Sequence, residues 1–318
     1  MDALDLLVDN LTSPIVLAFA LGVIARLLKS DLELPPAISS ALSIYLLFAI
    51  GLKGGVALAE TPAGDVVWPA VATLGFGVLT PLTAFAVARL RYDDANAAAL
   101  GAHYGSVSAV TFIAAITAAR AAGLPPEGFL PALVALLEVP AIVVALVLFS
   151  MRTGRGESWS SALREVVTGK SILLLVGGLL IGWVAGPEGT ASVQPFFVVA
   201  FDGALTLFLL ELGIVAASRL ADLRASGWFL LGFGIGVPLV HGAAGVTVAG
   251  LAGMSVGGAA VLGAMVASAS YIAAPAAVRI AVPEASPSIY LGASLGITFP
   301  FNLAVGIPLY LELARRLA

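Results

Sequence analysis

AAALGAHYGSVSAVTFIAAITAA, residues 97–119, has the length and apolarity of a membrane span but carries Gly105, Ser106 and Ser108 near its centre. A second run, 257–280, is interrupted in the same way by serines and a proline. Glycine and proline weaken a helix. A backbone that unwinds within a bilayer must line a cavity or be buried in protein, because lipid cannot bond its N–H and C=O groups. We therefore expect two facing breaks at mid-membrane, the arrangement of a substrate site in a transporter.

The composition excludes a water-soluble fold. Of the 318 residues, 60% are hydrophobic and 11% are charged, whereas soluble domains have about 45–50% and about 25%. The chain has no cysteine, which excludes disulfides and thiol chemistry. A net charge of −4 without a basic patch gives no sign of a nucleic-acid partner. A cleaved signal peptide begins with basic residues, whereas this chain begins with the acidic Asp2, Asp5 and Asp9. We therefore expect the first span to be retained.

The hydropathy pattern predicts an all-α integral membrane protein with ten transmembrane helices. One sizeable polar connection, 151–169, separates a first five-helix unit, 1–150, from a second, 170–318. The expected spans are 14–28, 37–59, 66–88, 97–119, 129–150, 170–186, 195–217, 227–251, 257–280 and 288–314.

The two halves repeat each other in sequence. Four matches recur in the same order with nearly constant offsets, between 157 and 162 residues. An odd number of spans per repeat forces the second copy to insert the other way up, so the broken helices four and nine face each other across a pseudo-two-fold axis. The matched segments are LGFG at 74–77 and 231–234, LGA at 100–102 and 262–264, Arg120 and Arg279, and Pro140 and Pro300.

Lysine and arginine predict the orientation, because cytoplasmic loops carry them in excess. Eleven follow the odd-numbered spans and three lie on the opposite side, so both termini are expected outside the cytoplasm and the 151–169 linker inside. The eleven are Arg26, Lys29, Arg89, Arg91, Arg152, Arg155, Arg164, Lys170, Arg219, Arg224 and Arg279, and the three are Arg120, Arg315 and Arg316.

The residues at the breaks predict an anion site. A helix N-terminus presents unpaired N–H groups and about half a positive charge, so a buried anion can be held without arginine. Ser108 and Ser270 are good N-cap residues for the half-helices that follow, and their hydroxyls can also donate to an anion. The alternative is that these hydroxyls bond back to their own helices and bend them. The candidate substrate contacts are Gly105, Ser106, Ser108, Ala109, Val110, Thr111, Ser268, Ala269, Ser270 and Tyr271.

A sodium site is predicted beside the anion. Glu138 lies inside the fifth span, and a carboxylate within a membrane is costly and by default functional; a capping or packing role beside Pro140 is the alternative. Asn302 in the matching part of span ten can be a sodium ligand or inter-helix glue. The candidate sodium ligands are Ser108, Thr111, Glu138, Ser270, Thr298 and Asn302.

Four further polar residues lie within or near spans. Lys53 and Glu211 can form an ion pair or reach the interface separately by snorkelling. His103 and His241, without a third clustered ligand, favour packing or hydrogen bonding over a transition-metal site, which we do not expect.

Short motifs over nearly the whole chain make it resemble the SbtA-type sodium-dependent bicarbonate transporters. They include Ser13-Pro14 and the runs LPPAIS at 34–39, IGLKGG at 50–55 and GSVSAVT at 105–111. The stretch 133–143 also matches, with Glu138 and Pro140, as does the C-terminal block. The matching residues of that block run from Ala267 through Arg279, Pro283, Pro287, Ser288, Tyr290, Gly292 and Pro300 to Pro308.

The resemblance implies ten helices in two inverted repeats, with helices four and nine crossing at mid-membrane. It implies a core, helices 3–5 and 8–10, that moves against a gate, helices 1, 2, 6 and 7. It also implies a homotrimer in the bacterial inner membrane, with bicarbonate between the breaks, sodium close by as the coupling ion, and no other cofactor. Tyr271 departs from the family pattern, which has an acidic residue there, and the short 151–169 linker argues against a regulatory PII-like partner.

We therefore predict a secondary transporter that imports bicarbonate with sodium by alternating access. Carriage of another small anion, such as a short monocarboxylate, with protons or sodium is the alternative. An anion channel and an intramembrane serine hydrolase fit less well, because two breaks with a buried carboxylate suit alternating access. Catalysis, in addition, needs one nucleophile rather than symmetric serines.

Overall fold

The computed structural model describes residues 8, 10–154, 164, 167–218 and 220–318, and the side chains of 220–226 are not described. The predicted features at Asp2, Asp5, Asp9, Arg155 and Arg219, and most of the 151–169 linker, lie outside this part. Within it the chain forms helices and no strand. The elements are α2 Pro14–Leu27, α3 Pro36–Glu60, α4 Ala63–Ala88, α5 Asp94–Gly105, α6 Ala109–Ala121, α7 Leu130–Thr153, α9 Lys170–Thr190, η1 Ala191–Val193, η2 Pro195–Val199, α10 Phe201–Ser218, α11 Leu220–Leu251, α12 Val256–Val266, α13 Ala274–Ala281, α14 Pro287–Leu291, η3 Gly292–Thr298, α15 Phe299–Phe301, η4 Asn302–Gly306 and α16 Ile307–Leu317.

Eight helical segments of the described chain are long and apolar enough to cross a membrane. Two of the ten expected spans fall short of that length. α2 has 14 residues, and the predicted ninth span is divided into α12, with 11 residues, and α13, with 8. The predicted fourth span is also divided, but α5 and α6 together form one continuous apolar segment, Asp94–Ala121.

Helix ends follow local signals in the sequence. The side chains of Asp93, Ser108 and Ser255 each accept a hydrogen bond from a backbone N–H in the first turn of the helix that follows. Such N-caps satisfy donors that a helix start leaves free. Gly154 ends α7 in the left-handed conformation, which glycine adopts without strain. These caps fix where α5, α6 and α12 begin, and the Ser108 cap thereby fixes the end of the first break.

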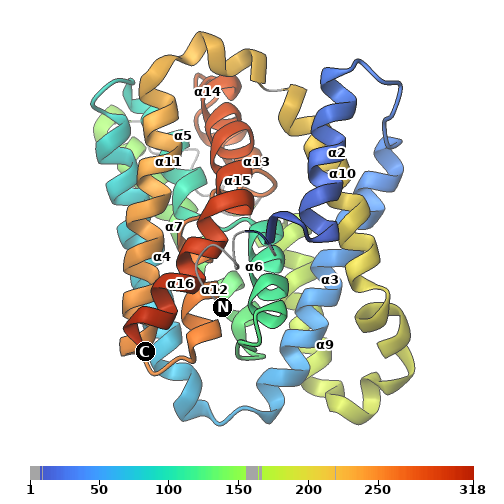
Figure 1. The fold of residues 1–318 in the computed structure, drawn as a ribbon. Helices are drawn as coiled ribbons and strands as arrows, with labels where there is room; N and C mark the ends of the chain where they lie inside the picture. The colour runs from blue at the N-terminus through green and yellow to red at the C-terminus, as the bar shows by residue number, and fades with distance from the viewer. Residues whose placement is uncertain (1–7, 9, 155–163, 165–166, 219) are drawn as a thin grey trace.

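The helices form two groups (Figure 1). α2, α3, α9 and α10 lie together; α4, α5, α7, α11, α12 and α14–α16 form the larger group, and α6 lies between the two. Within the four-helix group the most extensive contacts are those of α3 with α9 and of α2 with α10. The breaks and Glu138 belong to the larger group and face this four-helix group.

α3 and α9 approach so closely that backbone meets backbone. A Cβ atom on Gly51 would stand 2.3 Å from the Leu175 carbonyl oxygen, and one on Gly182 would stand 2.2 Å from the Leu52 oxygen. Membrane helices lack a hydrophobic drive toward one another and associate through such close contacts between small residues. Glycines spaced four apart therefore hold this pair together: Gly51 and Gly55 on α3, Gly178 and Gly182 on α9.

Candidate functional site

The helix is interrupted at residues 106–108, between α5 and α6, and at residues 267–273, between α12 and α13. The two breaks are hydrogen-bonded to each other. The Ser108 N–H donates to Ser268 Oγ at 2.8 Å, and the Ser270 N–H donates to the His103 carbonyl at 2.8 Å. The two interruptions indicated by the sequence are thus real and in contact, and each satisfies part of the backbone of the other.

The two breaks differ in how their second helix begins. Ser108 is the N-cap of α6, and its Oγ accepts from the Thr111 N–H at 3.1 Å, as predicted. Ser270 is not the N-cap of α13, because that position belongs to Ala273. Its Oγ instead accepts from the Ala274 N–H at 3.3 Å from one turn upstream. The second break is longer, so the serine sits further from the helix that it was predicted to cap.

A small pocket of about 10 Å³, room for one water molecule, lies between the breaks, α7 and the four-helix group. We call it the break pocket. Ser108 and Ala109 line it from the first break, Ser270 and Tyr271 from the second, and Glu138 from α7. The remaining lining residues are Leu47 of α3, Ser171 of α9, Val107 and Ile272. Five of the predicted site residues therefore meet in one cavity.

The break pocket offers donors for an anion. Ala109 and Val110 are the first two residues of α6, where N–H groups have no partner within the helix. The Tyr271 hydroxyl lies near Ser108 but makes no hydrogen bond of normal geometry. The Thr111 hydroxyl, which lies outside the pocket lining, is also buried with no hydrogen-bond partner in the described chain. Buried polar groups are rarely left unpaired, so an ordered water or a bound ligand is expected at these groups.

The pocket also contains one carboxylate. Glu138 is 6% exposed, and among the described residues none forms a hydrogen bond or ion pair with it. An ionised carboxylate at this depth is costly without a cation. Hydroxyls of Ser108 and Ser270 line the same cavity, so carboxylate and hydroxyl oxygens of the kind that bind sodium are present together.

Thr298 and Asn302 lie outside the pocket lining and are engaged elsewhere. Thr298 Oγ1 donates to the Gly234 carbonyl at 2.7 Å and is 2.6 Å from the Tyr104 hydroxyl. Pro238 has no N–H, so Gly234 has lost its normal helical donor and Thr298 replaces it. Asn302 Nδ2 donates to the carbonyl of Ala267 at 2.8 Å, and Ala267 is the first residue of the second break.

The other predicted contacts are buried beside the pocket. Ser106 Oγ has no hydrogen-bond partner in the described chain, and the side chains of Val110 and Ala269 are buried. A Cβ on Gly105 would stand 2.8 Å from Pro81, so glycine is needed there for packing against α4. These residues shape the break more than they line the cavity.

The remaining polar residues of the spans serve packing in the described chain. His103 Nδ1 is 2.7 Å from the Ala99 carbonyl, and His241 Nε2 is 2.8 Å from Thr83 Oγ1. Neither Ser106 nor Ser108 bonds to His103, and no cluster of three metal-binding residues occurs in the part described. Lys53 pairs with no carboxylate there, Glu211 included, but its ammonium lies 3.8 Å from the centre of the Phe201 ring.

Sequence reasoning missed the contributions of the four-helix group to the pocket. Leu47 and Ser171 line it from α3 and α9. Neither residue could be recognised as part of a site from the sequence. Leucine is common in membrane spans, and a serine near the start of a helix is most simply read as part of a helix N-terminus.

A helical membrane protein with a polar pocket between two mutually bonded helix breaks has the architecture of a transporter. The sequence matches the Na+-dependent bicarbonate transporter superfamily over residues 14–315. The chain therefore belongs to this superfamily of membrane transporters. A comparison with curated proteins finds no match.

Proposed function

We propose that the protein imports bicarbonate together with sodium by alternating access, with the anion held in the break pocket, which widens from its present volume to admit it. The observation that carries the proposal is the meeting of Ser108, Ser270, Tyr271 and Glu138 in one buried cavity. Unpaired N–H groups at the start of α6 and the Tyr271 hydroxyl bind the anion. Glu138 and the two serine hydroxyls bind sodium.

Charge balance favours binding both ions together. Bicarbonate and the Glu138 carboxylate are negative, and a buried charge is stable only when it is paired. Sodium between them offsets one charge, and the N-terminal dipole of α6 stabilises the other. A pocket loaded with both ions is therefore less charged than one loaded with bicarbonate alone, so the anion crosses the low-dielectric barrier more easily with sodium than without it.

The packing of the four-helix group supports two inverted five-helix repeats. In such repeats α2 corresponds to α9 and α3 to α10, so the pairs α2–α10 and α3–α9 are equivalent. Both pairs pack closely through glycine, at Gly22 and Gly213 in the first and at Gly51 and Gly182 in the second. We assign the four-helix group as the gate and the larger group with α6 as the moving core.

The setting of the transporter follows from the sequence. Lysine and arginine counts place both termini outside the cytoplasm and the 151–169 linker inside. By likeness to the family we expect a homotrimer in the bacterial inner membrane. The short linker leaves little chain for a regulatory PII-like partner to bind.

Uptake of labelled bicarbonate into proteoliposomes, with and without an inward sodium gradient, tests the function. We expect sodium-driven, saturable uptake that Ser108→Ala reduces at least tenfold. Ser288→Ala, at an exposed hydroxyl, is the matched control and should transport normally. Uptake that does not respond to sodium would contradict the coupling, and no uptake of bicarbonate would contradict the substrate.

A short monocarboxylate coupled to protons is the second candidate. Glu138 favours it, because a buried carboxylate that no described residue neutralises can exchange a proton as well as a sodium ion. Competition of acetate against labelled bicarbonate, measured at two external pH values, separates the two candidates.

A further inference from the structure

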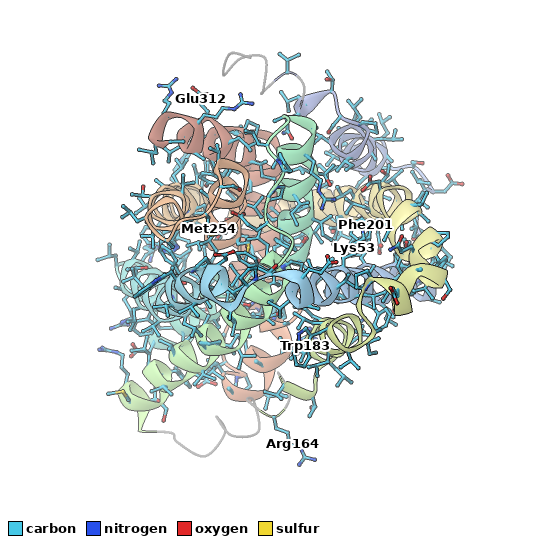
Figure 2. All side chains as sticks on the ribbon, turned by 90° about the horizontal axis from the view of Figure 1, so that it is seen from below. Lys53, Arg164, Trp183, Phe201, Met254 and Glu312 are labelled. Carbon is cyan, nitrogen blue, oxygen red and sulfur yellow. The ribbon has the colours of Figure 1, made fainter. Side chains whose placement is uncertain are left out.

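A second cleft lies between the four-helix group and α6, away from the break pocket. We call it the outer cleft. α3 contributes Lys53, α6 contributes Arg120, and the start of α10 contributes Phe201 and Asp202. Figure 2 shows Lys53 and Phe201 close together. A cleft with four such residues between two helix groups suits an ion pathway better than simple packing does.

The outer cleft and the break pocket lie at successive levels along α3. Leu47 lines the pocket, whereas Ile50 and Lys53 line the cleft. Six residues of helix separate Leu47 from Lys53, which is about 9 Å along the axis. An ion in the cleft would therefore be one to two helical turns from the pocket.

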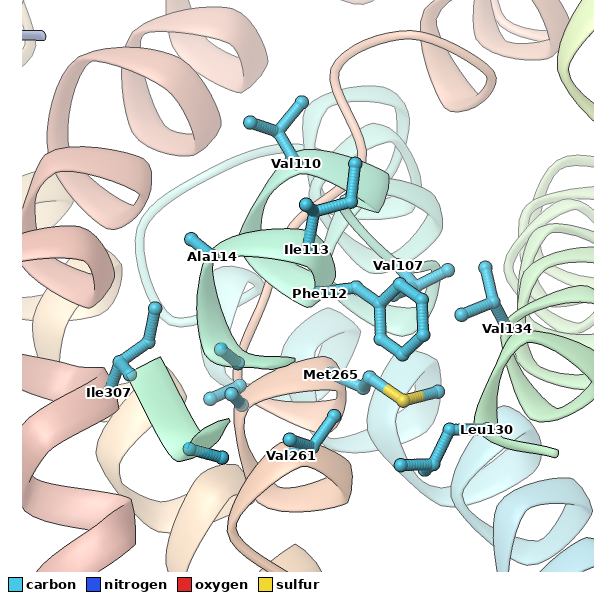
Figure 3. Packing of buried hydrophobic residues seen from close by; sticks show 14 of the residues in the cluster. Val107, Val110, Phe112, Ile113, Ala114, Leu130, Val134, Val261, Met265 and Ile307 are labelled. Atoms are coloured by element: carbon cyan, nitrogen blue, oxygen red, sulfur yellow. The ribbon is translucent and has the colours of Figure 1, made fainter. Parts of the chain in front are cut away.

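An apolar barrier separates the two cavities. Ile50 of α3 and Phe112 of α6 are both buried and both line the outer cleft at the end toward the pocket. Figure 3 shows the Phe112 ring beside Val107, Val134 of α7 and Met265. Val107 lines the break pocket itself, so Phe112 stands between the two cavities. The buried side chains of Ile50 and Phe112 thus lie between the outer cleft and the break pocket.

The cations of the cleft lack ion-pair partners among the described residues. The Lys53 ammonium lies over the Phe201 ring, and no carboxylate of the described chain lies within salt-bridge distance of Arg120. Two carboxylates also line the cleft, Asp202 and Glu127. Glu127 is already engaged, because its Oε1 accepts from the Ser255 N–H at 2.5 Å. A lysine inside a span is costly and marks an ion pathway by default.

We propose that the outer cleft is a second, weaker binding site for the transported anion, with Lys53 and Arg120 as its cations and Phe112 with Ile50 as the barrier beyond it. This inference rests on the proposed function for the identity of the anion. With the orientation given above, the cleft opens to the outside of the cell. It binds the anion there before the core moves, through the Lys53 ammonium and the Arg120 guanidinium, while Asp202 and Glu127 bring the formal charge of the lining to zero.

Thiol reactivity tests this without any transport measurement, since the chain has no cysteine of its own. Ile116→Cys places one thiol in the cleft, and Ala118→Cys places one on the opposite side of α6 as a control. Each is reacted from outside with a negative sulfonatoethyl and with a positive trimethylammonium-ethyl methanethiosulfonate. The ratio of the two rates reports the sign of the local potential.

We expect the ratio of the negative to the positive reagent's rate in the cleft to fall about sixfold with Lys53→Met, because one charge at ~8 Å in a watery cleft changes both rates in opposite directions. Lys53→Arg should keep the ratio. Asp202→Asn should raise the ratio. Bicarbonate should slow the reaction of the negative reagent with the Ile116→Cys thiol but not with the Ala118→Cys thiol. The Ala118→Cys ratio should not respond.

An unchanged ratio in Lys53→Met would overturn the proposal. So would equal effects of Lys53→Met and Asp202→Asn with recovery in the double variant, since that pattern describes a structural ion pair. If bicarbonate does not protect but another anion does, the cleft stands and the proposed substrate fails. If proteoliposomes transport bicarbonate but Lys53→Met leaves the rate ratio unchanged, the proposed function is supported and this inference is wrong.

Discussion

The backbone N–H of Ser108 donates a hydrogen bond to Ser268 Oγ, 2.8 Å away, and joins the two breaks directly. Ser268 Oγ also donates to the Met265 carbonyl at 2.7 Å, in the last turn of α12. The Ser268 hydroxyl thus bonds both to the end of α12 and to Ser108, the N-cap of α6. The Ser108 N–H is consequently occupied, which leaves the following two N–H groups of α6 for an anion.

Ser268→Ala should therefore disturb both breaks at once. It leaves the Ser108 N–H without an acceptor, and an orphaned buried group costs about 1–3 kcal/mol. We expect a lower thermal unfolding midpoint in detergent and weaker bicarbonate uptake. Ser294→Ala is the matched control, because Ser294 is also buried but only donates to the Tyr290 carbonyl of its own helix. Equal behaviour of the two variants would show that the bridge between the breaks is unimportant.

The close contact of α3 with α9 predicts a different sensitivity at two glycines of one helix. A Cβ on Gly182 would stand 2.2 Å from the Leu52 oxygen, whereas nothing lies within 4 Å of one on Gly177. Gly182→Ala should force the helices apart at a cost of about 1–3 kcal/mol. Gly177→Ala should be neutral or slightly stabilising, since alanine favours helix. Thermal unfolding of both purified variants measures the difference, and a stable Gly182→Ala variant would refute the tight packing.

The breaks could be predicted from the sequence because their cause is local. Serine and glycine in the middle of an apolar run weaken the helix wherever the run is placed, so residues 106–108 were identifiable. Ser108 as N-cap follows from the same local chemistry. The start of α13 was misjudged for the opposite reason: its position depends on packing over seven residues of irregular chain, 267–273.

Long-range partners were not predictable from a single sequence. Thr298 lies in the part of span ten that matches the Glu138 region of span five, and that position suggested a sodium ligand. In the structure the Thr298 hydroxyl donates a hydrogen bond to the Gly234 carbonyl, which has no helical donor because Pro238 lacks an N–H. Likewise Lys53 was considered with Glu211, but it stacks on Phe201. Which residue meets which across helices depends on rotation and tilt, and the hydropathy pattern contains neither.

Glu138→Gln should separate sodium binding from folding. The amide keeps the shape of the side chain but removes its charge, so the variant should fold and lose sodium stimulation of uptake by at least tenfold. Glu60→Gln, at the exposed end of α3, is the matched control. Uptake is measured over a range of sodium concentrations at fixed bicarbonate. Sodium dependence that survives in Glu138→Gln would remove this carboxylate from the coupling site.

Thr298→Val tests whether the tenth span contributes a sodium ligand or a structural bond. Valine has the same shape but leaves the Gly234 carbonyl and the Tyr104 hydroxyl without their partner, at a cost of about 1–3 kcal/mol. Because Thr298 lies outside the pocket lining, we expect a lower unfolding midpoint with little change in the sodium concentration that gives half-maximal uptake. Thr298→Ser keeps the hydroxyl and should restore stability. A large rise in that sodium concentration, without loss of stability, would instead assign Thr298 to the sodium site, as its position in the repeat predicts.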